Sequence, residues 1–343
     1  MYLCNLSIKD TISQMKKAVS KFIIHWHSKE PDILVRTSGS TGKPKTMRLS
    51  KKSMKESARL TGEFLNLKKG DRALLCLPID FIAGKMMAVR ADVIGMKLIA
   101  VKPSSNPLKT IDAEFDFAAM TPMQVYNILN TGNGYEKLNR IKNLIIGGGD
   151  IGHNLLQRIR KLNNKTYHTY GMTETITHVA MKKLTGPVPD KHFKALKNIT
   201  FEKDGRDCLV INAPHISKDK IITNDIVELF DNTGFDFKGR FDNMINTGGI
   251  KVFPETVEKK LSKYIRGRFI IAGLPDEKLG EKVVLIAGQS NTDISTDIFS
   301  RAGLTKYETP KEIHYIKLFR ETETGKIDRI ETKKYFIDHN KMK

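Results

Sequence analysis

Apolar residues recur at three- and four-residue steps from Thr11 to His27, and short apolar runs alternate with helical patterns after that point. The first stretch places its apolar side chains on one face, which predicts an amphipathic helix. Two further segments, 50–65 and 83–94, have helical spacing. Five short runs predict strands, at 33–36, 73–77, 97–101, 117–120 and 143–146. Strands that alternate with helices favour an α/β fold with a largely parallel sheet.

The pattern changes beyond Thr175. The dipeptide Asp204-Gly205 lies between two apolar runs and predicts a hairpin. We therefore expect a β-rich subdomain at about 176–241. From Asn243 onward, strands and helices indicate a compact α+β unit of about a hundred residues, which is a typical domain size. The expected domains are 1–241 and 242–343.

Length and composition indicate a globular protein. The 343 residues suggest about two domains, and 40% apolar content excludes disorder as the dominant state. The formal charge of +20 attracts nucleic acids, membrane surfaces and small anions alike. Because the lysines are spread over the chain and the aromatic residues are scattered, we expect solvated basic faces and no nucleic-acid partner.

Cysteine usage and the first residues bear on location. Cys4, Cys76 and Cys208 are widely spaced, so they indicate neither a disulfide framework nor a zinc site. The first ten residues lack a basic region followed by an apolar region, and no apolar run approaches the ~18 residues of a membrane span. We expect a cytoplasmic protein without a membrane span.

The segment 37–45 combines hydroxyls, glycines and lysines after a predicted strand. Glycine lets backbone N–H groups approach phosphate oxygens, hydroxyls add donors and lysine adds charge. It differs from a Walker A loop because only two residues separate its glycines and Pro44 follows Lys43. It could also be a plain surface loop. The candidate phosphate-binding residues are Thr37, Ser38, Gly39, Ser40, Thr41, Gly42, Lys43 and Lys45.

A second cluster, 169–175, offers an aromatic ring, hydroxyls and a carboxylate. Tyr170 could stack on a base and Thr173 could donate to a phosphate oxygen. Glu174 could hold Mg²⁺, which prefers one or two carboxylates together with substrate phosphates. Taken alone, the cluster could equally be an ordinary turn at a strand end.

Together, TSGSTGKPK and TYGMTET resemble motifs of the adenylate-forming enzymes, the superfamily of acyl-CoA synthetases. Further signatures follow in order. In Thr223-Asn224-Asp225 and Gly239-Arg240-Phe241-Asp242, the resemblance implies that Asp225 and Arg240 bind ribose and that Asp242 is a hinge. Gly248-Gly249 resembles the loop that shapes the CoA tunnel, and Thr324-Gly325-Lys326 resembles the motif of the adenylation lysine.

The resemblance implies an α/β adenylate-forming fold with a mobile C-terminal domain. The phosphate loop begins at residue 37, so the first part of the large N-terminal domain is expected to be shortened. Asn224 stands where the family usually has glycine.

The segment 77–90 is similar to o-succinylbenzoate:CoA ligases of menaquinone biosynthesis, with Arg90 six residues after Gly84. The acid is a dianion, and a buried carboxylate without a partner is costly. Arg90, which can bind a carboxylate through two N–H groups, and Lys85 could neutralise it. Lys85 could equally be a solvated lysine on an amphipathic helix. Gly147 and Gly148 could let backbone approach the acyl group.

The resemblance implies two half-reactions: formation of an acyl-adenylate from Mg·ATP and a carboxylic acid, then transfer of the acyl group to CoA. Lys326, Thr173 and Glu174 would act by positioning and charge stabilisation. Two alternatives stay open, namely loading of another aryl or fatty acid onto CoA or a carrier protein, and non-catalytic adenylate binding.

Overall fold

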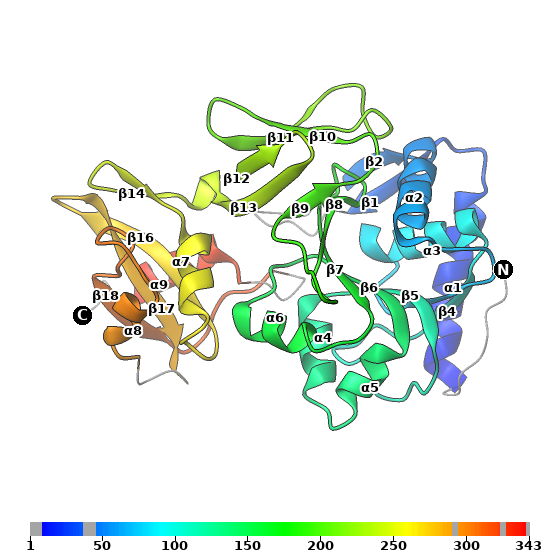
Figure 1. Ribbon diagram of the computed structural model, residues 1–343, viewed down its shortest axis with the longest axis horizontal. Helices are drawn as coiled ribbons and strands as arrows, with labels where there is room; N and C mark the ends of the chain where they lie inside the picture. Colours follow the sequence, from blue (N-terminus) through cyan, green and yellow to red (C-terminus); the bar gives the residue numbers. More distant parts are fainter. Residues whose placement is uncertain (1–8, 37–45, 290–293, 323–326, 341–343) are drawn as a thin grey trace.

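The structure is a computed structural model that describes residues 9–36, 46–289, 294–322 and 327–340 (Figure 1). Its centre is an eleven-stranded sheet in the order β10-β11-β12-β13-β9-β8-β7-β6-β5-β3-β4. The parallel part contains β3 (Arg72–Leu75), β4 (Lys97–Ala100), β5 (Phe115–Met120), β6 (Ile141–Ile146) and β7 (Lys165–Gly171). For these strands the predicted parallel sheet is confirmed.

Side chains of the parallel strands alternate between two cores. In β5, Phe117 faces one core and Ala118 the other, as the two-residue period of a strand requires. The first core lies beneath α1 (Lys9–Trp26), α2 (Lys51–Leu65) and α3 (Ile82–Ile94). The second is covered by α4 (Pro122–Leu129), α5 (Gly134–Asn139) and α6 (His153–Ile159). Helices on both faces explain why these strands are apolar throughout.

The first predicted strand does not join this sheet. Strand β1 (Asp32–Arg36) pairs antiparallel with β2 (Thr46–Ser50) in a separate two-stranded sheet. Assigning 33–36 to the parallel alternation was therefore wrong. Nine residues lie between the two strands in the sequence, and a connection of that length suits an antiparallel pair, whereas a parallel pair needs a dozen or more.

Helix α1 confirms the predicted amphipathic helix and is fixed at its end by the buried Lys51. The Lys51 ammonium donates to the carbonyls of His25 (2.8 Å) and Ser28 (2.9 Å). The Trp26 indole donates to Asp92 on α3 at 2.9 Å. Carbonyls at a helix end lack partners within the helix, so a buried lysine there satisfies them.

The β-rich region continues the central sheet. Strand β8 (His178–Lys183) is antiparallel to β7, and β9 (Phe193–Ala195), β13 (Gly234–Arg240), β12 (Ile221–Asp231), β11 (Cys208–Asn212) and β10 (Thr200–Lys203) follow in that order. The predicted hairpin at Asp204-Gly205 joins β10 to β11. The strands expected as a subdomain are thus hydrogen-bonded to the parallel sheet.

Residues from β14 onward form a second sheet, seen at the left of Figure 1. It contains β14 (Ile245–Thr247), β15 (Ile250–Val252), β16 (Phe269–Asp276), β17 (Gly280–Gly288) and β18 (Glu312–Ile316). Adjacent residues Ile270 and Ile271 face different cores, so this sheet also has two buried faces. Its helices are α7 (Pro254–Leu261), α8 (Asp297–Arg301) and α9 (Arg329–Asn340).

The two parts meet at η1 (Phe241–Asn243), a single 3₁₀ turn that contains Asp242. A second contact joins α6 to the end of α7, where the Asn154 amide donates to the Ser262 carbonyl at 3.1 Å. The predicted division at Asp242 thus falls on a short turn between two sheets, each of which has its own buried cores.

Candidate nucleotide and acid site

Glycines and hydroxyls gather where β6 and β7 end. In β6 and β7, Ile146 lies opposite His168, so Gly147 comes next to Thr169. A Cβ atom on Gly147 would lie 2.3 Å from the Thr169 hydroxyl oxygen, and Gly148 has φ +78°. A side chain at 147 would therefore displace the Thr169 hydroxyl, and a side chain at 148 would strain the backbone. The carboxyl ends of parallel strands are a common place for ligands in open α/β sheets.

The turn after β7 carries the predicted Thr173 and Glu174. Its shape is fixed by Thr175, whose hydroxyl accepts from the Met172 N–H (2.8 Å) and donates to the Thr177 carbonyl (2.7 Å). Buried Ile176 has φ +64°, which for a β-branched residue stores roughly 1–3 kcal/mol of strain. Thr173 is half-buried and Glu174 is exposed, so the carboxylate faces outward from a rigid turn.

Tyr170 and Asp225, which lie far apart in the sequence, are in direct contact. The Tyr170 hydroxyl donates to the Asp225 carboxylate at 2.6 Å, and its ring meets Phe235 edge-on at 4.9 Å. Burial raises the pKa of Tyr170 well above its usual value. Burial also raises the pKa of Asp225, although the Tyr170 hydrogen bond and the charge of Arg240 oppose that rise.

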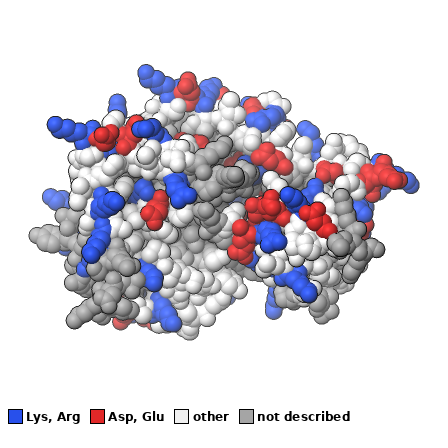
Figure 2. Space-filling model, turned by 180° about the vertical axis from the view of Figure 1, so that it is seen from behind, with Lys and Arg blue, Asp and Glu red and all other residues white. Residues whose placement is uncertain are grey.

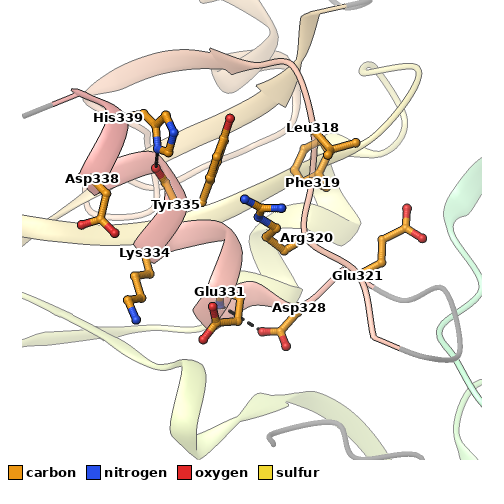
Figure 3. A pocket seen from close by; sticks show the side chains of 10 residues that line it. All are labelled: Leu318, Phe319, Arg320, Glu321, Asp328, Glu331, Lys334, Tyr335, Asp338 and His339. Atoms are coloured by element: carbon orange, nitrogen blue, oxygen red, sulfur yellow. Dashed lines mark hydrogen bonds between the residues drawn. The ribbon is translucent and has the colours of Figure 1, made fainter. Parts of the chain in front are cut away.

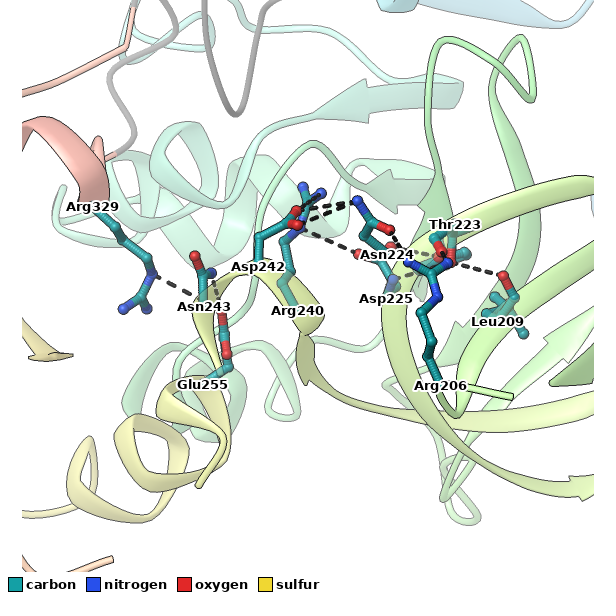
Figure 4. A network of polar contacts seen from close by, with 11 residues as sticks. Arg206, Leu209, Thr223, Asn224, Asp225, Arg240, Asp242, Asn243, Glu255 and Arg329 are labelled. Carbon is teal, nitrogen blue, oxygen red and sulfur yellow. Dashed lines mark hydrogen bonds and ion pairs between the residues drawn. The ribbon is translucent and has the colours of Figure 1, made fainter. Parts of the chain in front are cut away.

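Asp225 and Arg240 are cross-strand partners in β12 and β13, and both lie beside Asp242 (Figure 4). The Arg240 guanidinium lies 3.6 Å from Asp225 and 3.3 Å from Asp242. The Asn224 amide donates to Asp242 at 3.2 Å, and its oxygen accepts from Arg206 at 3.0 Å. The predicted ribose and hinge residues therefore form one charged network, in which Asn224 connects Arg206 to Asp242.

A second polar cluster continues from the hinge into α7. The Asn243 amide donates to Glu255 at 2.5 Å, and Arg329 lies 4.0 Å from the same carboxylate (Figure 4). A Cβ atom on Gly239 would lie 2.7 Å from the Glu255 carboxylate. Arg329 also pairs with the half-buried Glu258. Helices α7 and α9 are thus tied together next to the hinge.

Arg90 is 2% exposed, and its guanidinium contacts no carboxylate among the described residues. It donates to the hydroxyls of Thr61 (3.2 Å) and Thr177 (2.8 Å), and one nitrogen lies 4.0 Å from the Met87 sulfur. Burial lowers the pKa of Arg90 to about 9. A buried cation held only by neutral groups is costly, so this position suits an incoming anion.

Lys85 points to different partners. Its ammonium donates to the carbonyls of Ile79 (2.9 Å) and Asp80 (2.7 Å) and lies over the Phe22 ring of α1. Burial lowers the pKa of Lys85, which the Asp80 charge opposes. The structure does not bring Lys85 and Arg90 to common partners.

Gly248 and Gly249 form the tight turn between β14 and β15. Their φ angles are +60° and +80°, a pair that only glycine adopts readily. Both are exposed. The segment 37–45 and Lys326 lie outside the described residues, so Thr37, Ser38, Gly39, Ser40, Thr41, Gly42, Lys43 and Lys45 keep the status of predictions.

A groove lies on the C-terminal unit (Figure 3). Its centre is Tyr335, with Arg320 4.4 Å from the ring and the His339 ring at 4.0 Å. Carboxylates and bases alternate along its wall, among them Glu331 and Lys334. None of the predicted site residues is among the described residues that line it.

Surface charge, helix hydropathy and the placement of metal-ligating side chains add three observations. On the face seen in Figure 2, basic side chains lie apart, many of them beside acidic ones. Within the described ranges there is no helix of the length and apolar character that crossing a bilayer demands. The same ranges hold no group of three or more His, Cys, Asp or Glu side chains arranged to bind a metal.

Sequence reasoning missed four residues: Thr61, Thr177, His178 and Arg206. Thr61 lies inside a helical pattern and His178 begins an apolar strand, so neither carries a local signal. Only the packing of α2 and α3 against the β7–β8 turn brings Thr61 and His178 to Arg90. Arg206 follows a hairpin turn and could have been noted only for its charge.

Residues 13–202 match the family described as AMP-binding enzyme. Two curated relatives are a probable 2-succinylbenzoate–CoA ligase of Mycobacterium tuberculosis and a 2-succinylbenzoate–CoA ligase of Salmonella typhimurium. The first is 25% identical over 87% of this chain and 82% of the relative. The second is 22% identical over 92% and 71%.

Two solved structures were compared. An acyl-CoA synthetase (AMP-forming)/AMP-acid ligase II-like protein from Dyadobacter fermentans is 33% identical, with TM-score 0.64, over 97% of this chain and 96% of that one. The o-succinylbenzoate coenzyme A synthetase of Bacillus subtilis, in complex with ATP and magnesium ion, is 20% identical, with TM-score 0.72, over 89% and 70%. The chain therefore has the adenylate-forming fold.

Proposed function

Because the chain belongs to the AMP-binding enzyme family, we propose that it is an AMP-forming acid:CoA ligase whose acid is o-succinylbenzoate, in menaquinone biosynthesis. The acid reacts with ATP to give an acyl-adenylate and pyrophosphate. The CoA thiolate then displaces AMP. Curated relatives that carry this substrate in their names support the choice of acid.

The observation that carries the proposal is the buried Arg90, whose partners among the described residues are hydroxyls and a thioether. A dicarboxylic acid needs one carboxylate at the α-phosphate and a cation for the other. Arginine can donate two parallel hydrogen bonds to a carboxylate. Arg90 would hold the distal carboxylate, and Gly147 and Gly148 would let the backbone approach the acyl group.

The nucleotide would lie between the end of β7 and the Asp225–Arg240 pair of β12 and β13. Asp225, oriented by Tyr170 and flanked by Arg240, is a half-buried acceptor suited to ribose hydroxyls. Segment 37–45 and Thr173 would donate to the phosphates. Each of these groups acts by orientation and charge, because phosphoryl chemistry of this kind needs no protein nucleophile.

Glu174 suits a magnesium ion that is held mainly by phosphates. It is exposed on a fixed turn, and no hydrogen bond or ion pair joins it to another described residue. Mg²⁺ usually takes one or two protein carboxylates and completes its shell with phosphate oxygens and water. The ion would neutralise charge on the polyphosphate, while Glu174 orients it.

The C-terminal unit would supply Lys326 to the α-phosphoryl group during adenylation. Rotation at Asp242 would then exchange Lys326 for the Gly248-Gly249 turn, which would line a tunnel for CoA. Asp242 lies in a single 3₁₀ turn between the two sheets, and this location supports a hinge role.

The test is a screen of AMP release from ATP across aromatic and aliphatic mono- and dicarboxylates, with and without CoA. We expect the highest kcat/KM with o-succinylbenzoate and thioester formation only when CoA is added. Lys326→Ala should suppress acid-dependent pyrophosphate exchange by about 100-fold while thioester formation from supplied acyl-adenylate changes far less.

Two results would refute parts of the proposal. If AMP were released with monocarboxylates and not with dicarboxylates, dicarboxylic acids would be excluded as the substrate class. Transfer of the acyl group to a phosphopantetheinyl carrier protein, with no CoA thioester formed, would replace the CoA acceptor.

A further inference from the structure

Arg90 and three neighbouring side chains form a closed ring of hydrogen bonds. Thr61 comes from α2, Arg90 from α3, and Thr177 and His178 from the junction of the β7–β8 turn with β8. Arg90 donates to both hydroxyls. The His178 imidazole reaches the same two hydroxyls, Thr61 at 3.1 Å through Nε2 and Thr177 at 3.0 Å through Nδ1.

The directions of the hydrogen bonds in the ring determine the protonation state and tautomer of His178. The Thr61 hydroxyl donates a hydrogen bond to the Ser57 carbonyl at 3.0 Å. Its oxygen therefore accepts hydrogen bonds from Arg90 and from His178 Nε2–H. The Thr177 oxygen accepts from Arg90, and its proton points to His178 Nδ1. Every hydroxyl proton is used when the imidazole is neutral and carries its proton on Nε2.

The ring therefore orients the guanidinium without neutralising it. Burial, and after it the positive charge of Arg90, holds the pKa of His178 well below its usual value. A protonated imidazole would place a second cation against the first. A carboxylate in place of His178 would neutralise Arg90 and leave no net charge for a ligand.

One edge of the guanidinium is left for a ligand. Arginine has five N–H donors. Two are used by the threonine oxygens, and the Nη1 nitrogen faces only the weakly accepting Met87 sulfur among the described residues. Thr177 is half-buried whereas Arg90 is 2% exposed, so the ring is nearest to solvent on the Thr177 side.

We propose that Thr61, Thr177 and neutral His178 are positioning residues that aim the Arg90 guanidinium at the second carboxylate of a dicarboxylic acid substrate. The inference rests on the proposed function. It adds that selectivity for the dianionic acid depends on an imidazole that itself has no contact with substrate.

The experiment compares His178→Leu, His178→Gln and Thr61→Val with the wild-type enzyme in the AMP-release assay. Each protein is measured with o-succinylbenzoate, with a benzoic acid that lacks the second carboxylate, and with varied ATP. His178→Gln keeps a donor at the Nε2 position, so it tests rescue. Thr185→Val is the control, because Thr185 is equally buried, with its hydroxyl bonded to the Asn164 carbonyl.

For His178→Leu we expect the KM for o-succinylbenzoate to rise about 10- to 30-fold, since a misaimed guanidinium loses most of a charge-assisted hydrogen bond. The KM for ATP and the kcat/KM for the monocarboxylate should stay within about twofold. His178→Gln should recover most of the loss, Thr61→Val should follow His178→Leu, and Thr185→Val should leave the KM for o-succinylbenzoate unchanged.

Equal losses for both acids, or a parallel rise in the KM for ATP, would overturn the positioning role while the proposed function stands. A wild-type enzyme that releases AMP with no dicarboxylate would overturn the proposed function and this inference with it. Failure of His178→Gln to recover activity, in a protein that melts at the wild-type temperature, would also contradict the inference.

Discussion

Arg90 and Arg240 are both expected to meet substrate, yet their surroundings are opposite. Arg90 is buried among two hydroxyls, a thioether and a neutral imidazole. Arg240 is partly exposed between two carboxylates, Asp225 and Asp242. The first arginine has charge to offer a ligand, whereas the second is largely neutralised by the protein and holds its neighbours in place.

Because of this difference, the two arginines contribute in different ways to ligand binding and to the stability of the folded protein. A buried charge without a counterion weakens the folded state, and removing one partner of a paired network exposes the other to the same penalty. The same substitution, arginine to methionine, should therefore have opposite effects on stability at the two positions.

The largest effect is expected for Arg90→Met. We expect kcat/KM for o-succinylbenzoate to fall about 100-fold, because the distal carboxylate loses a charge-assisted pair. The free energy of unfolding should rise by about 1–2 kcal/mol, since a desolvated charge is replaced by an apolar chain of similar length. Steady-state kinetics and urea unfolding measure both, and Arg90→Lys, which keeps charge without the fork, should lie between. A less stable variant with unchanged acid KM would contradict the comparison.

Arg240→Met should behave in the opposite way. It leaves Asp225 and Asp242 without their shared cation, so the free energy of unfolding should fall by about 1 kcal/mol, a value kept small because the guanidinium is partly exposed. The KM for ATP should rise about 10-fold. Arg206→Met is the matched control, with a smaller effect on ATP because Arg206 pairs mainly with Asp204. Equal changes in the two variants would refute a special role for Arg240.

A smaller effect is expected at Asn224, the amide that connects Arg206 to Asp242. Asn224→Ala should lower the free energy of unfolding by about 1 kcal/mol, and Asn224→Asp by more, because a carboxylate would then face Asp242. Asn127→Ala, which removes an exposed amide bonded to the Ser105 carbonyl, serves as the control. Urea unfolding of the three variants measures these changes. A larger loss of unfolding free energy for Asn224→Ala than for Asn224→Asp would contradict the assignment of the Asn224 amide as the donor to Asp242.

The smallest effect is a shift along the pH axis. Burial raises the pKa of Asp225, so its carboxylate gains a proton more easily in the folded protein as the pH falls. The stability that the neutral form contributes is present at low pH and is lost as the pH rises through the folded pKa. ATP binding, which uses the carboxylate, has the opposite dependence.

Tyr170→Phe sharpens this test because it removes a hydrogen bond that lowers the pKa of Asp225. The rise in the KM for ATP on acidification should therefore begin at a higher pH in the variant than in the wild-type enzyme. An unshifted profile would show that Tyr170 does not tune Asp225.

Sequence patterns predicted the α/β class and most elements because apolar periodicity reports local burial. They misassigned β1, whose pairing depends on β2, a strand with little apolar signal. They identified Arg90 through spacing from Gly84 but gave no view of its partners. Thr61 and His178 are 117 residues apart, and only the assembled sheet brings them into contact. Contacts of that length leave no trace in a local pattern.

The cross-strand pairing of Asp225 with Arg240 has one further consequence. This pair is the last rung of the β12–β13 ladder before the chain leaves the sheet at Phe241. Under the proposed function, the ribose of the nucleotide lies against the hinge about which the C-terminal unit rotates. Nucleotide binding and rotation of the C-terminal unit would then act on the same residues. Binding of the nucleotide would therefore change the freedom of that rotation directly, without a chain of contacts through the protein interior.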